Sequence, residues 1–155
     1  MNQLLVLAGF FLLLVSMVNA QDVPSPTEVF GFQPGADYKL ADYDQMLDYY
    51  DKLDAASDRV HKIEIGETVL GRPTLLPFIS TEENLEQLDK WRTISEELSR
   101  ARVSEEEAQE LSKEGKAIIW IDGGMHATEL AHGQMTTELA YKIASKETGG
   151  DAADP

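Results

Sequence analysis

Several stretches of the chain carry apolar residues at the spacing of an amphipathic helix. The first begins after Asp42, a typical N-cap residue, and places apolar side chains at i, i+3, i+4 and i+7. These side chains are Tyr43, Met46, Leu47, Tyr50 and Leu53. The same reasoning predicts helices over residues 82–99, 104–113 and 128–145, the second of them opened by a capping box of Ser104 and Glu107.

Shorter apolar runs bounded by turn residues predict strands. Residues 60–70 and 74–79 flank the turn sequence Gly71-Arg72-Pro73, which predicts an antiparallel hairpin. Residues 117–122 are almost continuously apolar and stop at Gly123-Gly124, which predicts a buried central strand followed by a tight turn. The expected fold class is α/β, an incomplete α/β/α layered domain with a mixed sheet, because three strands are few for a sheet covered by helices on both faces.

The amino-terminal segment predicts export. Residues 4–18 are almost entirely apolar, and Val18-Asn19-Ala20 provides small residues at a signal-peptidase site, so we expect a signal peptide over residues 1–20 with cleavage after Ala20. An uncleaved anchor is the alternative, since about 20 apolar residues span a bilayer. The mature protein is expected to be secreted or periplasmic, with no stable membrane partner if the signal is cleaved.

After the signal, two regions are predicted. Residues 21–40 contain several prolines and glycines without regular periodicity, which predicts an extended lead-in before folding starts. Residues 41–155 form the folded portion, which resembles the first part of a larger domain.

The net charge of the chain limits the kinds of molecule that it is expected to bind. The formal net charge of −15 falls wholly after residue 20 and disfavours nucleic acid and anionic membrane surfaces as partners. Acidic residues between positions 82 and 114 alternate with basic ones, as on a solvated helical face. The chain has no cysteine, so it forms neither disulfides nor thiolate metal sites.

His126 and Glu129 are the candidate metal ligands. They follow the predicted central strand, and ligands bind at the carboxyl ends of strands in open α/β sheets. A His nitrogen and a carboxylate oxygen are zinc ligands, and a catalytic zinc usually has three protein ligands, so a third is missing. A His and a Glu at this spacing also arise by chance, and the alternative is ordinary chemistry at a helix start.

The sequence does not predict that either of the other two histidines is the third metal ligand. His132 lies six residues after His126, about 240° around a helix, and is predicted to be a partly buried helix residue. His61 is predicted to be an ordinary exposed strand residue. The HExxH and HxxEH motifs are both excluded, because each needs a His where the chain has Leu130.

At this point the chain resembles a known family. Residues 122–129, Asp-Gly-Gly-Met-His-Ala-Thr-Glu, resemble the first zinc-binding motif of the zinc carboxypeptidases of the carboxypeptidase A type. Residues 65–73 and 75–80 resemble the early hairpin of that family, in which a Gly-Arg-Pro turn links two strands. The resemblance covers roughly residues 40–147, the amino-terminal part of such a catalytic domain.

The resemblance implies peptide hydrolysis by a zinc-activated water in the intact domain, with peptide or protein substrates. It makes His126 the first and Glu129 the second Zn²⁺ ligand. It also implies a second His ligand, an Arg cluster, a Tyr and a general-base Glu farther along than residue 155, so the chain alone is expected to be inactive. Family members often carry an Arg where this chain has Thr128.

Three other interpretations stay open. The first is a related zinc amidohydrolase that deacylates amino acids, although such enzymes tend to have Gly where this chain has Ala127. The second is a non-catalytic secreted acidic binding domain with a self-sufficient fold. The third is a short form that regulates a full enzyme.

Overall fold

The computed structural model describes residues 23–126 and 128–145. The predicted signal peptide and its cleavage site lie outside these residues. Across the two described ranges, no helix is both long and apolar enough to cross a membrane.

The centre of the molecule is the predicted antiparallel hairpin, which is confirmed. Strand β1 (Val60–Glu67) pairs with β2 (Pro73–Ile79). In this register Val60 faces Ile79, and a bulge near Gly66 interrupts the pairing. The turn is closed by hydrogen bonds between residues 68 and 72, and Gly71 adopts a left-handed conformation with φ of 70°.

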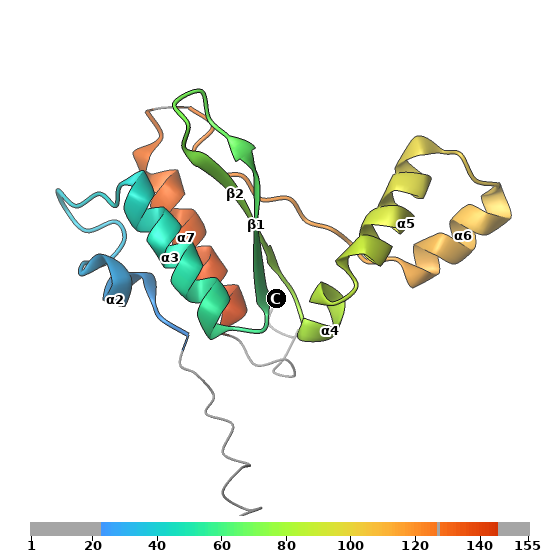
Figure 1. Cartoon of the computed structure of the whole chain (residues 1–155), viewed down its shortest axis with the longest axis horizontal. Helices are drawn as coiled ribbons and strands as arrows, with labels where there is room; N and C mark the ends of the chain where they lie inside the picture. The colour runs from blue at the N-terminus through green and yellow to red at the C-terminus, as the bar shows by residue number, and fades with distance from the viewer. Residues whose placement is uncertain (1–22, 127, 146–155) are drawn as a thin grey trace, which may run out of the picture.

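Two helices lie side by side on one side of this hairpin (Figure 1). Helix α3 (Tyr43–Ala56) begins at Asp42, whose side chain accepts a hydrogen bond from the Gln45 N–H while the Gln45 side chain returns one to the Asp42 N–H. Helix α7 (Leu130–Ala144) packs against α3 and β2. The core between them is made of Tyr49, Leu53, Val60, Ala140 and Ala144. The helix predicted after Asp42 is therefore confirmed.

The lead-in predicted as extended contains a short helix that joins the core, so that expectation is wrong for this part of the chain. Helix α2 (Pro26–Phe30) is opened by Ser25, which forms a full capping box with Glu28. Phe30 is buried, and its ring centroid lies 5.8 Å from that of Tyr49. Folding includes this segment because Phe30 covers one side of α3.

The acidic region forms an arm that projects from the body (Figure 1). The helix predicted over residues 82–99 is two helices, α4 (Glu82–Leu85) and α5 (Leu88–Arg100), and α6 (Glu105–Glu114) follows. The break is stabilised by the Trp91 indole N–H, which donates to the Asn84 carbonyl oxygen at 2.9 Å. Ser104 caps α6 by accepting from the Glu107 N–H, as the sequence predicts.

The predicted central strand does not form. Residues 117–121 have no assigned strand structure, and in the described part of the chain the sheet consists of β1 and β2. The apolar residues of this run are more than half exposed: Ile118, Ile119, Trp120 and Ile121. A strand needs a partner for its backbone hydrogen bonds, and no strand of the described residues pairs with this run. The mixed helix and strand content is that of an incomplete α/β domain.

Candidate metal centre

A glycine turn brings the exposed run onto helix α7. Gly124 has φ of 86°, a left-handed conformation that favours glycine. A Cβ atom on Gly123 would lie 2.5 Å from the Thr136 Cγ2 atom and 3.0 Å from the His132 carbonyl oxygen. The turn therefore lies directly on α7, closer than any larger residue would allow.

The side chains of His126 and Glu129 meet immediately after this turn. The His126 Nδ1 atom lies 2.8 Å from Glu129 Oε1, and the His126 backbone N–H donates to Glu129 Oε2 at 3.2 Å. The Glu129 backbone N–H in turn donates to the His126 carbonyl oxygen at 3.0 Å. The two residues form a closed hydrogen-bonded unit, so the structure brings the two predicted ligands together.

Glu129 occupies a different position from the one predicted. It is the residue that precedes α7, rather than a member of the helix's first turn, and its side chain makes no capping hydrogen bond. The carboxylate is turned to His126 instead. The alternative interpretation, ordinary chemistry at a helix start, placed Glu129 in the first turn, whereas the structure places it at the N-cap position of α7.

Hydrogen bonds keep the Glu129 carboxylate ionised. The His126 ring and then the His126 backbone N–H lower the pKa of Glu129 below its usual value. The lowered pKa means that this group loses its charge only at a more acidic pH than a free Glu does. The ionised form is the one that binds a metal.

His132 is closer to this unit than the sequence suggested. It was predicted to be a partly buried helix residue, but it is an exposed residue of α7 whose side chain is 49% exposed, and its Nδ1 atom lies 3.6 Å from Glu129 Oε2. The helical angle between His126 and His132 does not apply, because α7 starts at Leu130 and His126 lies before it, but the contact of His132 is with Glu129, three residues away. Glu129 thus has a His on each side.

The donor atoms fit zinc as part of a ligand set. Donors on one tetrahedral zinc, with bonds of about 2.0–2.1 Å, lie about 3.3 Å apart, so the 2.8 Å contact between His126 and Glu129 has to open only slightly. The ring proton on Nδ1 has to leave for that nitrogen to bind a metal. No group of three or more His, Asp or Glu side chains suited to a metal occurs within the described ranges.

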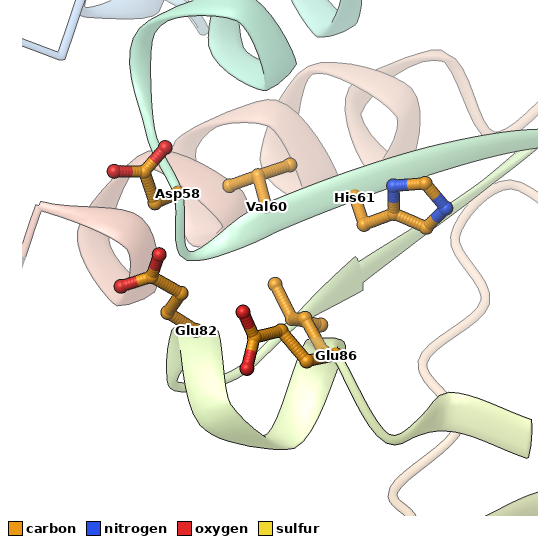
Figure 2. Close-up of a pocket in the computed structure, with 6 residues that line it drawn as sticks. Asp58, Val60, His61, Glu82 and Glu86 are labelled. Carbon is orange, nitrogen blue, oxygen red and sulfur yellow. The ribbon is translucent and has the colours of Figure 1, made fainter.

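Figure 2 shows a hollow in the surface whose lining includes neither His126 nor Glu129. Its volume is about 260 Å³, and it is lined by Asp58, Val60, His61, Glu82, Leu85 and Glu86. His61 is exposed, as predicted. The sequence analysis missed the hollow because its residues come from two separate segments, the turn before β1 with the start of that strand and α4 with its C-cap residue, which no motif connects.

Comparison with known proteins identifies the family. The family model described as zinc carboxypeptidase matches residues 46–153, more than half of the chain. This range includes the hairpin, His126 and Glu129. No curated protein matches the chain significantly, and no solved structure does. The chain therefore belongs to the zinc carboxypeptidase family.

Proposed function

We propose that the chain contributes the first two zinc ligands, His126 and Glu129, to a domain that hydrolyses peptides in the manner of a metallocarboxypeptidase. The observation that carries this proposal is the 2.8 Å contact between His126 Nδ1 and Glu129 Oε1. It occurs inside the segment that matches the zinc carboxypeptidase family. The proposed substrates are peptides or proteins.

The two ligands have complementary roles. The His126 side chain is 70% exposed, so its ring nitrogen remains accessible to a metal from solvent. The Glu129 side chain is 33% exposed and is fixed by two hydrogen bonds from His126, so it supplies a charged oxygen in a defined position. When bound, zinc would polarise a peptide carbonyl and lower the pKa of its own water.

We propose that the third ligand and the general base come from further sequence of the intact domain. Support comes from the lack of a three-residue metal group in the described ranges and from the exposed apolar run at residues 118–121. An active enzyme would require both missing groups, so we expect no hydrolysis from this chain alone.

Zinc binding by the chain provides the first test. We expect weak binding of Zn²⁺, detected by competition with a chromophoric chelator, and its loss in His126→Ala and Glu129→Gln. His61→Ala is the matched control, since His61 lies on β1 outside the unit. Zinc binding that survives both ligand substitutions would contradict the assignment.

Activity provides the second test. The product of the native gene, including any reading frame that continues after codon 155, is assayed with a blocked dipeptide and with an N-acyl amino acid. The proposal expects chelator-sensitive release of the carboxy-terminal residue and its loss in Glu129→Gln. Cleavage of the N-acyl amino acid but not of the dipeptide would favour an amidohydrolase. Cleavage of neither substrate, together with a stability that does not depend on zinc, would favour a binding domain.

A further inference from the structure

The outer end of the arm is a short exposed loop. Residues 101–104 join α5 to α6 at the end of the arm that lies farthest from the body (Figure 1). Ala101 ends α5 in a left-handed conformation with φ of 49°. Arg102 follows with an exposed side chain, and among the described residues no backbone hydrogen bond involves Arg102 or Val103. The backbone at this bond is therefore less restrained than that of the helices on either side.

We propose that the loop is a processing site, at which an arginine-specific endoprotease cuts the peptide bond between Arg102 and Val103. Exposed loop tips are preferred sites of proteolytic cutting, because they open locally without unfolding the core. A protease of this class binds the arginine guanidinium in a pocket that has a carboxylate at its base. Arg102 is the basic residue that the loop presents, and the loop contains no lysine.

The proposed reaction is a hydrolysis that consumes one water molecule and leaves the protease unchanged. The hydroxyl group of the water joins the Arg102 carbonyl carbon, and the remaining hydrogen joins the Val103 nitrogen. The first fragment then ends in the Arg102 carboxylate, and the second begins with the Val103 amine.

Two of the other arginines are protected in the body. Arg59 is half-buried immediately before β1, and its carbonyl oxygen accepts the Ser80 N–H at 3.0 Å. The start of the hairpin would have to open before a protease could bind there. Arg72 is followed by Pro73, which has no N–H and a fixed backbone, and the Arg72 guanidinium lies 3.1 Å from the Asp44 carboxylate.

The two remaining arginines belong to helix α5. Arg92 lies in the interior of the helix, so cutting after it requires α5 to unfold. Arg100 is the last residue of α5, and its guanidinium lies 2.6 Å from the Glu96 carboxylate. Arg102 differs from both because it lies outside the helix. Of the five arginines of the chain, it is therefore the one that the fold presents to a protease.

A cut in this loop would leave one molecule made of two fragments. Across the arm, Lys90 Nζ lies 2.8 Å from Glu114 Oε1. A Cβ atom on Gly115 would lie 3.0 Å from Cγ2 of the buried Ile94, so α5 and the end of α6 are in close contact. The two fragments also share the core, because α3 belongs to the first and α7 to the second. The hairpin and the proposed metal ligands would stay together after the cut.

Limited digestion of the full chain with an arginine-specific endoprotease tests the site. Wild type, Arg102→Gln and Arg100→Gln are compared under native conditions, and mass spectrometry identifies each new terminus. We expect the first cut after Arg102, and an initial rate at least about 10-fold lower in Arg102→Gln, because the charged protease pocket loses its partner. Arg100→Gln is the matched control, since it removes a neighbouring exposed arginine, and it should be cut at the wild-type rate. In urea, where the fold no longer protects them, Arg59 and Arg92 should be cut as well.

Two further measurements follow the cut product. It should elute from a size-exclusion column at the volume of the uncut chain, and its fragments should separate in urea. Protein recovered from cells that express the native gene, with protease inhibitors present throughout, should contain a fraction whose second fragment begins at Val103.

Each measurement has a result that would overturn the inference. A first cut after another arginine, or an unchanged rate in Arg102→Gln, would show that the loop is not the accessible site. Recovery of uncut protein alone from the native cells would show that the loop is not a processing site. Fragments that separate without urea would contradict the shared contacts of the arm and the core. The proposed zinc function is tested separately, since none of these readouts involves a metal.

Discussion

At the scale of single residues, Tyr49 combines full burial in the core with an ionisable hydroxyl group. It is fully buried in α3, and its hydroxyl group has no hydrogen-bond partner among residues 23–126 and 128–145. Burial raises the pKa of Tyr49 above its usual value, since the charged phenolate would be poorly solvated there. The stability that depends on neutral Tyr49 is fully present below the unfolded pKa of about 10 and is lost as pH rises toward the folded value.

We expect Tyr49→Phe to raise the free energy of unfolding at neutral pH by about 1 kcal/mol. The reason is that a buried hydroxyl without a partner costs free energy, while the ring keeps its packing. The variant should also lose less stability above pH 10, although Tyr50, whose pKa is raised by burial too, keeps part of the effect. Urea denaturation measures both, and Tyr38→Phe, at a fully exposed position, is the control. A less stable Tyr49→Phe variant would show that the hydroxyl has a partner.

At the scale of elements, the sequence predicted the structure where a pattern was long or locally closed. Helix α3 and the hairpin follow from periodicity and turn residues. Helix α2 was missed because it is five residues long, although its capping signal, Ser25 with Glu28, was present in the sequence. The strand prediction for residues 117–121 was wrong for another reason. An apolar run indicates that a segment favours burial, but a strand also needs a second strand for its backbone hydrogen bonds.

Local spacing along the chain also explains the contacts in the candidate site. The spacing of His126 and Glu129 was sufficient to predict their contact, because both lie in one short turn. The approach of His132 to Glu129 follows from their spacing of three residues, which makes side chains neighbours on a helical surface, but the sequence analysis compared His132 with His126 only.

Helix α2 should be energetically important despite its length. We expect Phe30→Ala to lower the free energy of unfolding by about 3 kcal/mol, because it removes a buried ring that contacts Tyr49. Thr27→Ala, on the exposed side of the same helix, should have little effect. Thermal and urea denaturation measure the free energy of unfolding of both variants and of the wild type. Equal stability of both variants and wild type would mean that α2 is not part of the cooperative fold.

At the scale of the whole molecule, the buried core lies on one side of the hairpin, and a continuous apolar run at residues 118–121 lies outside it. Helices α3 and α7 cover one side of the hairpin, whereas residues 118–121 expose an unbroken row of large apolar side chains. Exposed apolar runs with unpaired backbone groups favour association with another strand. This is the arrangement expected of a strand whose neighbours belong to further sequence of the intact domain.

The final prediction uses Ile119, whose side chain is 81% exposed. In this chain we expect Ile119→Lys to leave the free energy of unfolding within about 0.5 kcal/mol of wild type, since little is buried there, and to reduce self-association seen by light scattering. In a longer product of the same gene, a strand covered on both sides would make the buried lysine strongly destabilising. Val69→Lys, at the exposed hairpin tip, should be neutral in both proteins. If Ile119→Lys also left the stability of the longer protein unchanged, residues 118–121 would be a surface segment there too. The third zinc ligand would then have to approach His126 and Glu129 without a sheet that includes these residues.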